Sequence, residues 1–264
     1  WQLSPVLLSL LYRSSQCLLP QFRPIKFLTR SFSSSLHCTL MLSGRPHKFL
    51  PPSPNAHNLF NDVIQRLDRS GTERSKVAIE KYMRNAVLSR GNQTPAINKA
   101  ATAALHHFSS LPAVDIYSAA FLLLVSNNII DDHSAALQMI SKRLILSGEI
   151  YEECNSQLRE RMLDDIEAVF EGGSVNDWAS SDSFSGRVIG PFVARHPERR
   201  AVADRVLRWS HRDHATSSIW LRRAGHVSFV TLVHNRLGRK PATDTRPAGG
   251  TSEARYQRGA GGDE

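Results

Sequence analysis

The chain has 264 residues and a formal net charge of +9 at pH 7. That length is enough for one or two domains with a sizeable core. No stretch reaches the ~18–20 apolar residues that a membrane-spanning helix needs. The cysteines Cys17, Cys38 and Cys154 show no metal-ligand spacing. The sequence therefore predicts neither a membrane protein nor a metal site, and the single thiol of the central part indicates a reducing, intracellular compartment.

The charge is distributed unevenly along the chain. Residues 1–61 contain six Lys or Arg and no acid, whereas residues 62–237 contain 22 basic and 20 acidic residues. Within the central part, residues 149–182 hold ten acids, and residues 184–237 hold ten arginines and no lysine. Arginine favours forked contacts with groups such as phosphate oxygens. Two interpretations of the arginine stretch stay open, a contact surface for a polyanion and an ordinary solvated face.

The two ends of the chain differ in composition from the centre. Residues 1–55 are rich in Ser, Leu and Arg and lack acids, which is typical of an organelle transit peptide. They are predicted to be a disordered leader whose removal leaves the stability unchanged; a secretory signal, or untranslated sequence ahead of Met41, are the alternatives. Residues 238–264 are predicted to be a disordered tail. The expected compartment is the mitochondrion or plastid if the leader is a targeting signal, and otherwise the nucleus or cytoplasm.

Between the ends, capped amphipathic segments follow one another. Their signals include Thr72 as an N-cap, Pro95 in a first turn, and Gly172 and Gly173 after a long helix. The expected helices span about 55–67, 73–88, 94–108, 112–125, 131–148, 149–172, 175–195, 198–209 and 217–237. No alternating strand pattern competes with them. The fold class is therefore predicted to be all-α.

Successive helix pairs begin about 40 residues apart, at Pro95, Asp131, Val175 and Ser217. This spacing matches the period of HEAT and armadillo repeats, in which helical hairpins stack side by side. Residues 56–237 are therefore expected to form a right-handed stack of antiparallel hairpins, a HEAT-like α-solenoid. One helix of each hairpin would line its concave face.

Two helical segments combine a tryptophan with a charged residue. Trp178 precedes Asp182 by four residues, and Trp220 precedes Arg223 by three, so each pair shares one helix face. An indole beside a carboxylate suits a ligand that is flat and cationic, or a sugar ring that develops positive charge. An isolated pair of this kind is more often a buried Trp beside a solvated acid. Adjacent arginines such as Arg222 and Arg223 are also usually solvated.

The segment Asp177–Ser183, followed by the segment Ser218–Ala224, resembles the signature of the DNA alkylation repair family. These proteins are alkylpurine DNA glycosylases built of HEAT-like repeats. In that family, a Trp and an Asp one turn apart precede a Trp-x-Arg-Arg-like run. The segment Ala78–Asn85 also resembles an early helix of the family, and the similarity covers residues 77–235.

The resemblance implies a monofunctional glycosylase that hydrolyses the N-glycosidic bond of N3- or N7-alkylated purines in base excision repair. Its partner would be duplex DNA with alkylated bases, and it would act as a monomer without a metal or cofactor. It implies that Trp178 contacts the deoxyribose, that Asp182 stabilises the developing sugar cation and positions water, and that Arg223 holds the DNA backbone. It also implies that the damaged base is not drawn into a deep pocket. Further DNA-binding residues are predicted at Arg222, Arg187, Arg195 and Trp220.

Other functions are kept as alternatives. The family has a second sugar-facing Trp, but no Trp follows Trp220 in this chain, so the repair domain is expected to be truncated at its C-terminal end. The alternative is a catalytically impaired HEAT-repeat module that binds DNA or an acidic protein partner. A protein-binding scaffold predicts that Trp178 and Trp220 are buried and that Asp182 faces bulk water. The DNA hypotheses predict that Trp178 and Asp182 lie on the concave face beside Arg223.

Overall fold

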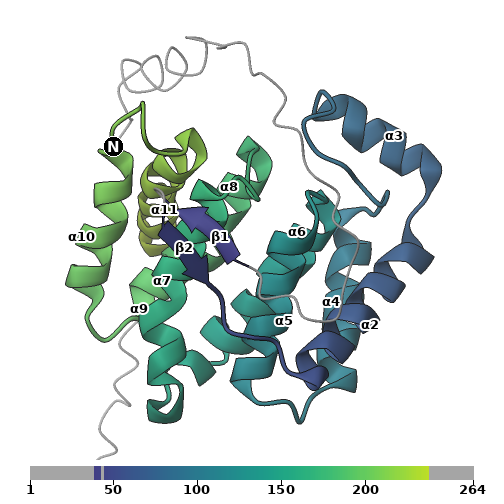
Figure 1. The fold of residues 1–264 in the computed structure, drawn as a ribbon, viewed down its shortest axis with the longest axis horizontal. Helices are drawn as coiled ribbons and strands as arrows, with labels where there is room; N and C mark the ends of the chain where they lie inside the picture. Colours follow the sequence, from purple (N-terminus) through teal and green to yellow (C-terminus); the bar gives the residue numbers. More distant parts are fainter. Residues whose placement is uncertain (1–38, 43–44, 238–264) are drawn as a thin grey trace, which may run out of the picture. The chain divides into compact units, whose positions relative to one another are not determined.

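The computed structural model describes residues 39–42 and 45–237, which all belong to one compact unit (Figure 1). The predictions made for residues 1–38 and for the tail 238–264 fall outside the described residues. The described part is helical apart from one antiparallel hairpin, so the all-α prediction is confirmed with that exception. No helix within it is long and apolar enough to cross a membrane.

The hairpin comes first and the helices follow in chain order. Their bounds are β1 (Thr39–Leu42), β2 (Arg45–Lys48), α2 (Pro54–Ser70), α3 (Glu73–Tyr82), α4 (Thr94–His107), α5 (Ala113–Ser126), α6 (Ile130–Met139), α7 (Ser156–Glu171), α8 (Trp178–Phe184), α9 (Gly190–Arg195), α10 (Arg199–Ser210) and α11 (Ile219–Leu237). The segments η1 (Ile140–Leu146) and η4 (Ser185–Ile189) are π-helical, and η2 (Glu149–Tyr151) and η3 (Glu153–Asn155) are 3-10 turns.

Helix starts follow the capping signals in part. The Thr72 hydroxyl accepts a hydrogen bond from the backbone N–H of Ser75 at 3.3 Å, as predicted for α3. The helix expected to run on to residue 88 ends at Tyr82 instead. Arg84 and Asn85 follow with φ of 54° and 58°, a left-handed conformation that cannot continue a right-handed helix.

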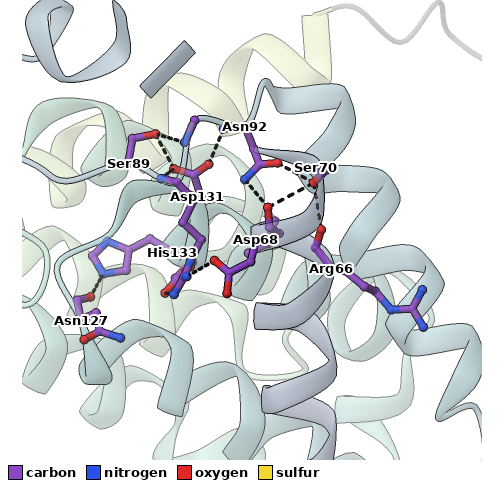
Figure 2. Close-up of polar contacts among 12 residues, drawn as sticks. Arg66, Asp68, Ser70, Ser89, Asn92, Asn127, Asp131 and His133 are labelled. Carbon is purple, nitrogen blue, oxygen red and sulfur yellow. Dashed lines mark hydrogen bonds and ion pairs between the residues drawn. The ribbon is translucent and has the colours of Figure 1, made fainter. Parts of the chain in front are cut away.

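The loop after α3 is held by a buried carboxylate at the start of α6. Asp131 accepts hydrogen bonds from the Ser89 hydroxyl at 2.7 Å and from the backbone N–H groups of Arg90 and Asn92 at 3.1 and 2.8 Å (Figure 2). Asp132 binds the Arg90 guanidinium through both carboxylate oxygens, at 2.6 and 2.9 Å. Since buried backbone N–H groups need acceptors, these carboxylates replace the helical bonds that the loop lacks.

Side-chain hydrogen bonds between different helices, or between a loop and a helix, recur at similar sequence separations. The bonds with separations of 39 to 42 residues include Ser89–Asp131, Ser181–Trp220, Ser185–Ala224, Arg205–Asp164 and Trp209–Glu167. A repeat of about 40 residues produces this recurrence when equivalent helices pack side by side. Buried apolar residues from α2 through α11 form one hydrophobic cluster.

Residues 48–55 contact the helices that follow them. Phe49 and Leu50 pack against the core, and the Phe49 ring lies 5.7 Å from that of Phe121 on α5. Ser53 caps α2 and its hydroxyl donates to Asp115 at 2.7 Å. Phe49, Leu50 and Ser53 therefore belong to the folded unit, although the predicted leader runs to residue 55.

We expect Phe49→Ala to lower the free energy of unfolding by about 2 kcal/mol, because it removes a half-buried ring from the core surface. Urea denaturation of the full chain measures this change. Phe49→Leu is the control and is expected to retain most of the stability. An Ala variant as stable as the parent would show that the Phe49 ring does not anchor this segment to the core.

Candidate active site

Trp178 is the first residue of α8. Asp177 caps the helix by accepting from the backbone N–H of Ser180 at 2.8 Å. This start places the Trp178 indole at the helix tip, where 43% of the residue is exposed. Its ring meets Tyr82, the last residue of α3, edge to face with centroids 6.3 Å apart. Two exposed rings from α3 and α8 therefore form an apolar wall.

Asp182 and Arg223 form a bidentate ion pair between α8 and α11, which lie side by side (Figure 1). The Nε and Nη2 atoms of Arg223 donate to the two carboxylate oxygens of Asp182, each at 2.8 Å. The side chains remain 32% (Asp182) and 43% (Arg223) exposed. The hydrogen bond to Asp182 raises the pKa of Arg223, and partial burial opposes it. The fork fixes the direction of both groups while leaving them open to a ligand.

The structure therefore brings Asp182 and Arg223 into direct contact, with the exposed Trp178 one turn earlier on α8. This contact is one part of what the DNA hypotheses predict; the concave face and the DNA-binding roles of these residues stay predictions. The protein-scaffold hypothesis predicts that Trp178 and Trp220 are buried and that Asp182 faces bulk water; Trp178 is exposed, and Asp182 is bound to Arg223. Trp220 is partly buried and packs against the core, so its ring serves packing at least in part.

The other predicted DNA-binding arginines lie in different surroundings. Arg222 is buried, with 8% of the residue exposed, and its Nε has no hydrogen-bond partner among the residues that the structure describes. Arg187 is half-buried on η4. Arg195 ends α9, beyond the π-helical segment η4 that follows α8, and its Nη1 donates to the Ile145 carbonyl at 2.8 Å. The structure does not bring Arg195 to the ion pair.

Tyr82 was not predicted as a site residue. The sequence signal for it was only an apolar position in the predicted helix 73–88, where an inward-facing ring is expected. Because α3 ends at Tyr82, its ring is 72% exposed and reaches Trp178 instead. The segment Ala78–Asn85, which resembles an early helix of the repair family, contains this residue.

The acidic and arginine-rich stretches partly neutralise each other. Arg205 on α10 pairs with Asp164 on α7, and Arg212, which follows α10, pairs with Glu167 on α7 at 2.5 Å. Glu167 also accepts from the indole N–H of Trp209 at 3.0 Å. Among the described arginines of this stretch, those without an ion pair are Arg187, Arg195, Arg199, Arg200, Arg208 and Arg222. The arginine stretch thus serves packing between helices as well as the surface.

The ion pair lies on an open surface. Two cavities among the described residues have other linings: one lies between residues 48–52 and α5, and the other lies beside α3. No group of three or more His, Cys, Asp or Glu with metal-ligand geometry occurs in the part of the chain that the structure describes. A ligand at Asp182 would therefore be met by a surface of mixed charge and aromatic rings.

We expect the Asp182–Arg223 pair to contribute less than about 1 kcal/mol to stability, because exposed ion pairs are well solvated when separated. A double-mutant cycle with Asp182→Asn and Arg223→Ala, measured by urea denaturation, gives this coupling. A coupling above about 2 kcal/mol would indicate that the pair exists for the fold.

Comparisons with known proteins fit this geometry. No match was found among curated proteins or solved structures. Residues 63–249, more than half of the chain, match the family model described as DNA alkylation repair enzyme. The match runs from α2 past the end of α11 and includes Trp178, Asp182 and Arg223. This confirms the resemblance seen in the sequence: the chain belongs to the family of DNA alkylation repair enzymes.

Proposed function

We propose that the protein is a monofunctional DNA glycosylase that excises N3- or N7-alkylated purines from duplex DNA. The observation that carries the proposal is the Asp182–Arg223 fork beside the exposed Trp178. We also propose that the helices form a right-handed stack of HEAT-like hairpins. The recurrent 39 to 42 residue separations of the inter-helix bonds support that arrangement.

The chemistry needs a negative charge close to the sugar. An alkylated purine carries a positive charge, so it takes both electrons of the C1′–N bond and leaves as a neutral base. The positive charge then moves to the sugar, as in glycoside hydrolysis. Asp182 is attracted to the sugar only once that charge develops, which stabilises the transition state more than the ground state. Water adds to C1′ and loses a proton, with Asp182 as its acceptor.

Arg223 has one edge for Asp182 and another for DNA. Nε and Nη2 bind the carboxylate, and no bond from Nη1 is found among the described residues. A guanidinium has five N–H donors, so the Nη1 edge is available to a phosphate oxygen while the fork persists. Trp178 provides a flat apolar surface for the deoxyribose. An open site of this kind suits an enzyme that does not enclose the base, in contrast to base-flipping enzymes with a deep pocket.

We expect Asp182→Asn to reduce release of 7-methylguanine from methylated duplex DNA by about 10²–10³-fold, because one electrostatic contact to the transition state is lost. Base release is measured by chromatography under single-turnover conditions. Helicity and affinity for unmodified duplex are expected to stay unchanged.

Asp164→Asn is the matched control, since Asp164 is also an exposed aspartate paired with an arginine, but on α7. It should leave base release at the parental rate. Equal loss in both variants, or normal release with Asp182→Asn, would contradict the catalytic role.

We expect Arg223→Ala to weaken duplex binding and to make the slope of log K against log salt less negative by about 0.9, the value for one phosphate contact. Fluorescence anisotropy across a salt series measures the slope. Arg205→Ala is the control, because the Arg205 side chain is directed to the acids of α7. A slope that does not change with Arg223→Ala argues against a phosphate contact.

A second candidate is a module that binds DNA without cleaving it. It is favoured by the pairing of Asp182, because both of its carboxylate oxygens already accept hydrogen bonds from Arg223. Duplex binding by the parent protein without release of any methylated purine would support this candidate over the glycosylase.

A further inference from the structure

Two buried serines connect the helix of Asp182 to the helix of Arg223. The Ser181 hydroxyl on α8 donates to the Trp220 carbonyl at 3.0 Å. The Ser185 hydroxyl at the start of η4 lies 3.3 Å from the Ala224 carbonyl and 2.8 Å from the Ser181 carbonyl, so its single proton is shared between them. Both serines are fully buried.

The two bonds define a single register between parallel helices. Each joins residues 39 positions apart, and each is separated from the other by one turn on both helices. Asp182 follows Ser181 directly, and Arg223 lies between Trp220 and Ala224. A slip of one residue rotates a helical side chain by about 100°. Such a slip would move the Asp182 carboxylate away from the guanidinium.

The two hydroxyls affect the orientation of α8 and η4 on α11 more than they affect the stability of the fold. Phe184 and Val188 on the same helical run are fully buried and anchor it in the core. The carbonyl oxygens of Trp220 and Ala224 each have two lone pairs. The Ala224 carbonyl also accepts a hydrogen bond from the hydroxyl of Ser228, in the same helix α11, at 2.7 Å. Removing the serine hydroxyls therefore leaves the carbonyls with helical partners and the apolar contacts in place.

We propose that Ser181 and Ser185 are positioning residues that hold α8 and η4 in register on α11, so that Asp182 meets Arg223. The inference rests on the proposed glycosylase function of that pair. The serines do not touch the DNA; they act through the direction of the carboxylate. A transition-state contact depends on that direction, because small displacements of a catalytic group cost large factors in rate.

The test compares the double variant Ser181→Ala/Ser185→Ala with the parent in full-length protein. We expect kcat for release of 7-methylguanine from methylated duplex to fall at least tenfold, with KM changed less than twofold. Ser228→Ala is the matched control, because it also removes a fully buried hydroxyl that donates to Ala224, but within one helix. It should retain the parental kcat. Equal losses in the control and in the double variant overturn the proposal.

A second readout does not depend on activity. The Arg223 Nε–H, held by Asp182 at 2.8 Å, should give a slowly exchanging signal in ¹⁵N–¹H NMR, assigned by its disappearance in Arg223→Lys. In the double variant this signal should broaden or move to the chemical shift of a solvent-exposed arginine. In Ser228→Ala its chemical shift and line width should stay unchanged. If the double variant does not fold, Ser181→Ala alone is measured in the same way.

The kinetic and NMR measurements distinguish a failure of the glycosylase proposal from a failure of the positioning proposal. A parent protein without any base release contradicts the glycosylase function, and the NMR comparison still decides whether the serines position the pair. An unchanged Arg223 signal in a folded variant, with parental kcat where release occurs, overturns the positioning role.

Discussion

The side-by-side contact of α8 and α11 is the constraint on which the site depends. Asp182 and Arg223 are 41 positions apart in the chain and meet only because these helices pack in one register. The buried serines facing α11 let the two backbones approach and supply the hydroxyl bonds to its carbonyls. A bulky residue at position 181 or 185 would separate the helices before it affected any charged group, since interiors leave no spare volume. The small size of Ser181 and Ser185 therefore permits the close helix contact on which the Asp182–Arg223 ion pair depends.

The acids and arginines of the second half of the chain also act through neighbouring helices. The acids of α7 receive Arg205 of α10 and Arg212 of the segment that follows it, and the acid of α8 receives Arg223 of α11. The same kind of contact, between an acid on one helix and an arginine about one repeat later, thus occurs at both places. Its surroundings differ between α7 and α8. On α7 it joins two helices and includes the indole N–H of Trp209. On α8 it stands beside an exposed ring and is open to a ligand.

Sequence patterns predicted the helices and singled out Asp182 and Arg223. They predicted less well which residues surround this ion pair. Periodicity and caps such as Thr72 determine where helices form, and the shared face of Trp178 and Asp182 follows from helical spacing alone. Whether a residue at the end of a helix packs inward depends on where that helix stops, so the role of Tyr82 required the left-handed turn at Arg84 to be known. The burial of Arg222 and the carbonyl contact of Arg195 depend on neighbouring elements, which no local pattern encodes.

A carboxylate that is already paired with a guanidinium is a weaker source of negative potential than a free one, so the pair poses a question for catalysis. The geometry offers an answer, because the fork uses only the Nε–Nη2 edge of Arg223. On the proposed function, a phosphate on the Nη1 edge draws positive charge away from Asp182 without breaking the fork. The carboxylate then keeps its orientation while its effective charge becomes more negative. Because the dipoles are already in place, little reorganisation is needed when the sugar cation forms, which is the condition under which electrostatic stabilisation is most effective. DNA binding and catalysis would then be coupled through one side chain, and the register of α8 on α11 sets the strength of that coupling.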